Sequence, residues 1–251
     1  MLNLFWAMIK KEYYDRRFYF FNTLSYIFTL YMIFLFVFLG AKSFLGNKTI
    51  EGIVVGFWIW GATLDAYSLL SLSLISEARL GTLEQLFMIP YGFKWVSAAM
   101  IVANFIYSFL IQSIILILMM ITTGKFLHLD VVSIIPLWII TIIAIHGLGF
   151  MLGGLALIYK RISSSYQIMQ LVFAFLIAAP VEKHLYLKFL PLGLGYRMIQ
   201  KVMHDGIKIW ELPGTDLLIL SFTSFLYLFI GFAVFSYFEK KARNMGVLSH
   251  Y

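Results

Sequence analysis

The stretch VVSIIPLWIITIIAIHGLGFMLGGLALI, residues 131–158, decides the fold class because it contains no charged side chain. At ~1.5 Å per residue, a helix of this length exceeds the roughly 30 Å hydrocarbon core of a bilayer. Other apolar runs are also long enough to cross, and the six predicted spans cover about 18–41, 53–75, 95–123, 131–158, 163–180 and 215–238. We therefore expect an all-α polytopic membrane protein, with a single transmembrane domain over 1–251.

The composition points the same way. Of the 251 residues, 62% are hydrophobic and 12% are charged, whereas soluble domains are nearly half apolar and about a quarter charged. This excludes a cytosolic enzyme, a secreted protein and a nucleic-acid binder. The net charge of +7 is typical of basic residues that flank spans and contact anionic lipid headgroups, so the expected surrounding is the lipid bilayer and no nucleic acid. Without cysteine, disulfides, thiol catalysis and cysteine metal sites are excluded.

Residues 1–17, which precede the first span, predict a short amphipathic helix at the membrane interface. Its apolar residues recur at helical spacing; they are Leu2, Phe5, Trp6, Ile9 and Tyr13. Its basic residues are Lys10, Lys11, Arg16 and Arg17. Six spans place both termini on one side, where most Lys and Arg of the short connections also fall. The positive-inside rule therefore predicts cytoplasmic termini in the plasma membrane.

The longest connection, 181–214, does not read as an ordinary loop. It contains EKHLYLKFLPLGLGYRMIQKVMHDGIKIWELPG, whose apolar pieces are too short to span and are interrupted by Pro191, Gly193 and Gly195; Pro180 precedes it. Such pieces dip into the membrane and return, or lie on its surface. We expect an extracellular re-entrant helical pair before the last span.

Asp65 and His146 are the carboxylate and the histidine that lie well inside the predicted spans, which contain no Lys or Arg. Ionisable groups at such depth are functional candidates by default. They lie about 18 and 22 Å from the outer ends of their spans, so an Asp65–His146 pair near mid-membrane could form and serve a proton-coupled secondary transporter. The alternative is that Asp65 hydrogen-bonds Tyr67, Ser68 or a neighbouring helix while His146 is simply packed.

No catalytic constellation stands out. The histidines lack paired spacing, and the chain has no nucleophile elbow, no metal-ligand motif and no P-loop, so we expect no ATPase site, metal or cofactor in this chain. An intramembrane enzyme would need 181–214, whose polar residues have a spacing that supports no particular reaction. The G-x-x-x-G pairs Gly52/Gly56 and Gly149/Gly153 let helices approach closely, more often within one chain than across a dimer.

The polar stretch EARLGTLEQLFMIP, residues 77–90, separates the second and third spans. Thr82 can cap a short helix that has Glu84 and Gln85 in its first turn and ends at Pro90. An apolar stripe on this helix needs a partner; it consists of Leu83, Leu86 and Phe87. The alternative is a helix lying on the membrane surface.

The pattern Glu77-x-x-x-Gly81-Thr82-x-Glu84-x-Leu86-x-x-x-Pro90 resembles the cytoplasmic signature of the type-2 ABC exporter permeases. The resemblance extends more loosely over the whole chain, through the N-terminal interfacial helix, six spans and a proline-marked segment before the last span. Leu80 departs from it, because the family commonly has a basic residue there.

This resemblance implies that 77–90 is a coupling helix seated in a groove of a separate ATP-binding subunit. The implied contacts are Glu77, Arg79, Gly81, Thr82, Glu84, Leu86 and Pro90, with the basic interfacial helix beside them. Two permease copies, or this chain and a similar one, would form the pathway, while ATP and Mg²⁺ bind the partner subunit. The apolar, aromatic spans suit export of a hydrophobic or amphipathic substrate such as a drug, lipid or glycan-lipid.

Overall fold

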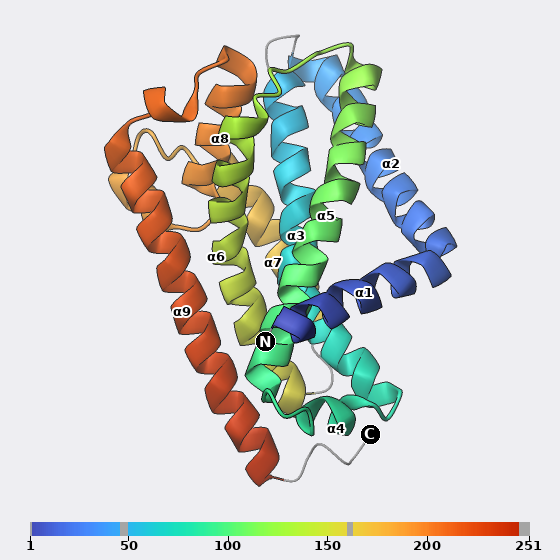
Figure 1. Ribbon diagram of the computed structural model, residues 1–251. Coiled ribbons are helices and arrows are strands. Elements are labelled where there is room, and N and C mark those ends of the chain that lie inside the picture. The colour runs from blue at the N-terminus through green and yellow to red at the C-terminus, as the bar shows by residue number, and fades with distance from the viewer. Residues whose placement is uncertain (1, 46–49, 160–162, 246–251) are drawn as a thin grey trace.

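The structure, a computed structural model, describes residues 2–45, 50–159 and 163–245, which form helices and turns with no strand among them (Figure 1). The helices are α1 Leu2–Phe18, α2 Phe20–Leu45, α3 Ile50–Arg79, α4 Leu83–Phe87, α5 Phe93–Thr123, α6 Val131–Ile158, α7 Ser163–Ala178, α8 Gly193–Asp205 and α9 Gly214–Asn244. Two short 3-10 helices, η2 Leu185–Phe189 and η3 Ile209–Glu211, flank α8. The all-α prediction is confirmed.

Five helices within the described ranges are long and apolar enough to cross a membrane, namely α2, α3, α5, α6 and α9. This fits a multi-pass membrane protein, and α6 coincides with the predicted span 131–158. The predicted span 163–180 is not among the five, because α7 has 16 residues and measures about 24 Å. Pro180 follows its end, and the residues before a proline avoid helical geometry. The six-span topology stays a prediction, and its charge count includes Lys48, Lys160 and Arg161, which lie outside the described residues.

Several helix ends differ from the predicted ones. The stretch 77–90 is not one helix: α3 continues to Arg79, a turn with Gly81 at φ +71° follows, and α4 is limited to Leu83–Phe87. At the other end of the chain, α9 continues six residues past 238 to Asn244. An Arg243–Glu239 ion pair of 2.7 Å, one helical turn apart, stabilises this extension. Hydropathy marks where apolar residues stop, and polar residues can continue a helix beyond that point.

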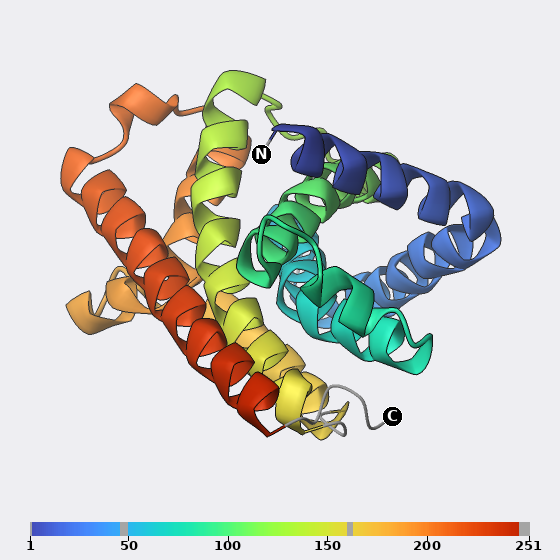
Figure 2. The same cartoon turned by 60° about the horizontal axis from the view of Figure 1, so that its bottom comes forward.

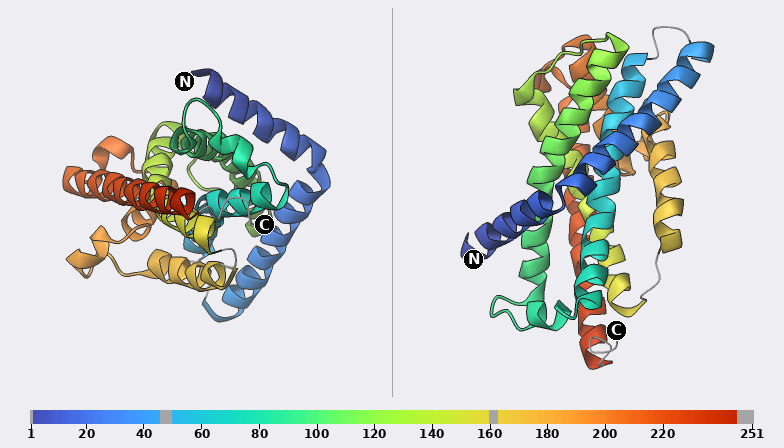
Figure 3. Two further views of the ribbon diagram at one scale, coloured as in Figure 1. Left: turned by 90° about the horizontal axis from the view of Figure 1, so that it is seen from below. Right: turned by 90° about the vertical axis from the view of Figure 1, so that its right-hand side faces the viewer.

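The long helices form a bundle around α6, which packs on α9, α3 and α8. α4 and the C-terminal end of α9 lie at one end, which we call the α4 end; α8 lies toward the other, the α8 end (Figures 1 and 2). α1 crosses the bundle obliquely near the α4 end and packs on α5. Seen from the α4 end, α1 and α2 follow the outer edge of the bundle (Figure 3).

Glycines set the closest helix contacts. A Cβ on Gly231 of α9 would lie 2.0 Å from the carbonyl oxygen of Gly147 on α6, so these backbones touch directly. The pair Gly149/Gly153 faces Ala66 and Leu70 of α3, as expected for packing within the chain. The remaining pair, Gly52/Gly56, faces side chains of α7 and α8 in the same chain.

The predicted break points in 181–214 need correction. Gly193 and Gly195 do not interrupt a helix, because both lie in the first turn of α8. A Cβ on Gly195 would lie 2.0 Å from Thr141 Oγ1 of α6, so this glycine allows close packing rather than a chain reversal. Pro191 precedes α8, where the chain turns at Leu192 with φ 78°. A membrane-dipping path for this segment stays a prediction.

Candidate functional site

Glu77 joins three segments at the α4 end. Its carboxylate pairs with Lys11 of α1 and accepts a hydrogen bond from the Thr82 hydroxyl. Its carbonyl oxygen accepts the Thr82 backbone N–H at 2.9 Å. Thr82 therefore occupies the N-cap position of α4 without capping it, contrary to the prediction, since its side chain bonds Glu77 instead. Glu77 closes the α3–α4 turn and anchors α1 to it.

The inner face of α4 packs against its own chain. Leu83 is 3% exposed, and Leu86 packs against two apolar clusters, one formed by α1 and α5 and one to which α3, α5, α6 and α9 contribute. The Phe87 ring stacks on Phe93 of α5 with centroids 3.8 Å apart, and the Arg243 guanidinium of α9 lies 5.0 Å from the Phe87 centroid. The partner that the apolar stripe needs is thus supplied by α1, α5 and α9.

The opposite side of α4, which we call the α4 outer face, is exposed. We include in it the exposed residues next to α4 along the chain, so that it consists of Glu84 and Gln85 of α4, Met88 after it, and Arg79 and Leu80 before it. Leu80 and Met88 are 72% and 75% exposed. Gly81 and Pro90 are also exposed, whereas Glu77, Thr82 and Leu86 are partly buried. The residues of the coupling pattern therefore divide into a set that fixes α4 and a set that is open to a partner.

The face of α1 that packs on the chain overlaps the predicted apolar stripe only in part, through Phe5 and Ile9. Leu4 and Met8 are buried against Val96, Ala99 and Ala103 of α5. Leu2 and Trp6, expected on the apolar face, are 86% and 68% exposed. Because apolar residues occur on two sides of α1, their spacing alone cannot tell which side packs on the chain and which faces outward.

The basic residues of α1 lie in different surroundings. Lys11 holds Glu77, and Arg16 pairs with Glu12 at 2.8 Å while lying 5.8 Å from the Tyr107 ring centroid of α5. Lys10 lies over Tyr14 on its own helix, and Arg17 is exposed. Lys11 and Arg16 thus tie α1 to the bundle, while Lys10 and Arg17 remain on the surface.

Asp65 lies within a polar network that joins α2, α3 and α5. Its carboxylate accepts hydrogen bonds from Tyr26 at 2.5 Å, Ser108 at 2.8 Å and Gln112 at 3.2 Å. Among the described contacts, Asp65 bonds neighbouring helices but neither His146 nor the nearby Ser68, whose hydroxyl bonds the Leu64 carbonyl. The three donors were missed by sequence reasoning, although polar side chains within apolar spans usually face the bundle interior.

His146 lies apart from this network. It is 4% exposed, its ring centroid lies 5.8 Å from that of Phe105, and it lines an apolar cavity of about 760 Å³ between α5, α6 and α9. The mid-membrane pair with Asp65 does not form, because Asp65 faces α2 and α5 while His146 faces this cavity. No group of three or more His, Asp or Glu able to hold a metal ion occurs in the described part of the chain.

If the chain is a transporter, as the sequence predicts, Asp65→Asn is expected to retain transport, because an amide still accepts from Ser108 or Gln112 and can donate to the Tyr26 oxygen. Asp65→Leu leaves buried donors unpaired and is expected to destabilise the protein by about 1–3 kcal/mol. Transport assays across pH and thermal unfolding of both variants check this. Complete loss of transport in a stable Asp65→Asn variant would contradict a structural role and favour proton coupling.

No family model matches the chain, and a search of curated proteins finds no match. The resemblance to the exporter permeases therefore rests on 77–90 and on the order of the predicted elements.

Proposed function

We propose that this chain is the permease subunit of an ATP-driven exporter of the type-2 ABC class. The observation that carries the proposal is α4, a short helix outside the long apolar helices, fixed on its inner face and open on its outer face. Such a helix suits docking of a separate ATP-binding subunit. The outer face combines exposed Leu80 and Met88 with charged Arg79 and Glu84, the mixture of apolar and polar groups that protein interfaces use.

The contacts of α4 supply routes from that docking surface to the spans. Glu77 connects α4 to α3 and α1, the Phe87–Phe93 stack connects it to α5, and Arg243 connects it to α9. Closure of the ATP-binding subunit would therefore displace four helices together. Differential contact with α4 in the two nucleotide states would shift the population between inward-open and outward-open permease. ATP and Mg²⁺ are bound by the partner in this scheme.

The proposal includes the finer topology. α7 is taken as a sixth, short crossing, the η2–α8 segment as the extracellular re-entrant part, and the α4 end as cytoplasmic, in the plasma membrane. Two permease copies, or this chain and a similar one, would enclose the pathway. α7 is shorter than the hydrocarbon core of the bilayer is thick. This difference is tolerable because short spans are accommodated by local thinning of the bilayer or by association with a second copy.

A reporter fused after Tyr251 is expected to lie in the cytoplasm, because α9 ends at the α4 end. A cytoplasm-active fluorescent fusion and a fusion active only outside the membrane give opposite signals. Activity of the external reporter would overturn this orientation and with it the docking of a cytoplasmic ATPase.

The exporter proposal is tested by gentle solubilisation of C-terminally tagged protein from its native cell. A P-loop ATPase should co-purify in about equal amount. Recovery of this chain alone under several mild detergents would contradict the proposal. The proton-coupled carrier would then be tested with Asp65, although its network offers no described link to His146.

A further inference from the structure

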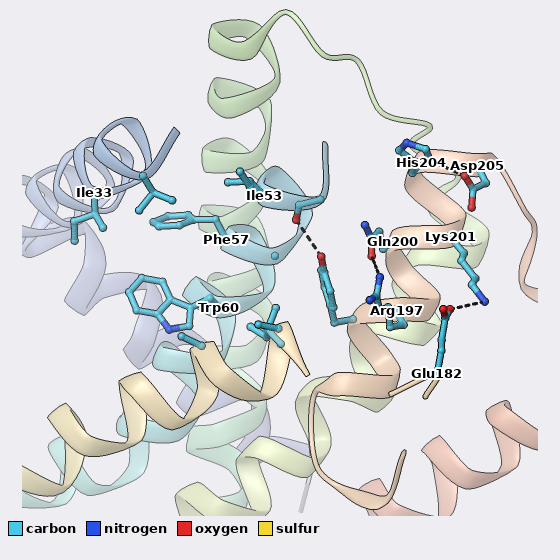
Figure 4. Close-up of a pocket in the computed structure, with 17 residues that line it drawn as sticks. Ile33, Ile53, Phe57, Trp60, Glu182, Arg197, Gln200, Lys201, His204 and Asp205 are labelled. Atoms are coloured by element: carbon cyan, nitrogen blue, oxygen red, sulfur yellow. Dashed lines mark hydrogen bonds and ion pairs between the residues drawn. The ribbon is translucent and has the colours of Figure 1, made fainter. Parts of the chain in front are cut away.

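A cavity of about 890 Å³ lies toward the α8 end, between α2, α3, α7 and α8 (Figure 4). Its two sides differ in chemistry. The walls from α2, α3 and α7 are apolar, with Ile33, Phe57 and Ile177 among the lining residues. α8 provides the opposite wall, and the labelled charged and amide side chains of Figure 4 lie along that helix or beside it.

Most of the charges in this wall are neutralised by neighbours. Lys201 pairs with Glu182 at 3.2 Å. His204 contacts Asp205 at 2.5 Å and Glu51 at 2.8 Å. The hydrogen bond with Asp205 and the charge of Glu51 raise the pKa of His204 above its ordinary value, which favours the paired, charged form. These groups therefore have little charge left for a ligand.

Arg197 differs from them. Its Nη1 donates to the neutral Gln200 Oε1 at 3.0 Å, and its guanidinium lies 6.0 Å from the Tyr196 ring centroid. Its Nε is buried and has no hydrogen-bond partner among the described residues. No carboxylate of the described chain pairs with it. A guanidinium cannot lose its proton in a protein, so the α8 wall of the cavity retains one positive charge, and the guanidinium keeps donors that this chain does not use.

We infer that this cavity binds an amphipath with an apolar chain and an anionic headgroup, which Arg197 holds. A phosphate, sulfate or carboxylate can accept from two nitrogens of one guanidinium at once. The chain would then lie along Phe57 and Trp60, where Trp60 is fixed by a 3.1 Å hydrogen bond to the Gln170 carbonyl. A neutral headgroup would leave the charge of Arg197 without a counter-charge, and a cationic one would be repelled by Arg197.

That the amphipath is cargo rests on the proposed exporter function, but its binding does not. The same chemistry could come from a resident bilayer lipid. The probes are therefore bromine-labelled single-chain phosphatidic acid and its monoacylglycerol analogue, which has the same chain but no phosphate, added to the purified full-length permease in nonionic detergent. Bromine quenches tryptophan fluorescence on contact, and Trp60→Phe identifies the signal from the cavity.

The wild type is expected to bind the phosphatidic acid probe at least about tenfold more tightly than the monoacylglycerol probe, the scale of a charge-assisted hydrogen bond. Arg197→Gln should remove this preference. Arg197→Lys, which keeps the charge but not the fork, should retain part of it. Lys208→Gln, which removes a charge from the same end outside the cavity lining, should behave as wild type.

Equal affinity for the two probes, or an unchanged preference in folded Arg197→Gln, would overturn the inference. Quenching of Trp60 that appears only after a dimer is dissociated would also overturn it. That result would mean that a second copy of the chain occupies the cavity in the dimer. If binding is as expected, stimulation of ATP hydrolysis in the co-purified complex identifies cargo, and unchanged hydrolysis identifies a resident lipid. Binding without any co-purified ATPase would overturn the exporter proposal alone.

Discussion

Glu84→Lys is expected to abolish transport and partner-stimulated ATP hydrolysis while membrane insertion and folding stay normal. Glu84 is exposed on the α4 outer face, so its replacement disturbs no buried contact of this chain. The substitution reverses a charge within the proposed docking surface. A contact between like charges across a protein interface costs several kcal/mol of binding free energy. The measurements are ATPase co-purification, hydrolysis in reconstituted vesicles and thermal unfolding of the solubilised protein.

Glu211→Lys is the matched control, because it makes the same charge reversal on an exposed residue toward the α8 end. It removes one hydrogen bond to the Lys208 backbone N–H but should leave ATPase binding intact. Normal coupled hydrolysis in Glu84→Lys would contradict the role assigned to α4. Equal loss in both variants would show that the effect comes from net charge rather than from docking.

Gly231→Ala is expected to destabilise the helix bundle strongly. The new Cβ would lie 2.0 Å from the Gly147 carbonyl oxygen, and a backbone atom cannot move aside as a side chain can. α6 and α9 would have to separate along their crossing, and overpacking of this kind costs about 1–3 kcal/mol. Thermal unfolding in detergent and the yield of monodisperse protein measure the loss.

Gly40→Ala provides the comparison. A Cβ at Gly40, also within a helix, meets no atom within 4 Å among the described residues, so stability should be unchanged or slightly raised by the better helix propensity of alanine. Similar unfolding temperatures for the two variants would contradict the direct backbone contact between α6 and α9.

The sequence predicted best what depends on runs of apolar residues. α6 begins and ends where the uncharged stretch 131–158 does, because Asp130 precedes it and Lys160 and Arg161 follow it in the sequence. Prediction was poorer where polar residues decide the structure. Glu84 and Pro90 mark a short helix, yet the expected Thr82 cap is absent because the Thr82 hydroxyl bonds Glu77 instead, a contact that the capping pattern does not contain.

Partners distant in sequence account for the rest. The depth of Asp65 identified it as a candidate, but depth alone gives no direction around the helix axis, so His146 could not be distinguished from Tyr26, Ser108 or Gln112 as its partner. Likewise Arg197 was one of several cations in 181–214. Its unpaired state is visible only when the carboxylates near α8 have been assigned to Lys201 and His204.

The attachment of α1 constrains how the protein is assembled. α1 is the first of the described helices to leave the ribosome, but the surfaces that hold it are Glu77, at the end of α3, and Val96, Ala99 and Ala103 of α5. Its docked position does not exist until those later helices have been made and inserted. During synthesis α1 therefore cannot reach its final position at once. Until those helices are in place, we expect its amphipathic character to keep it in the lipid headgroup region. The first of the described helices to be translated is thus among the last to be fixed in place.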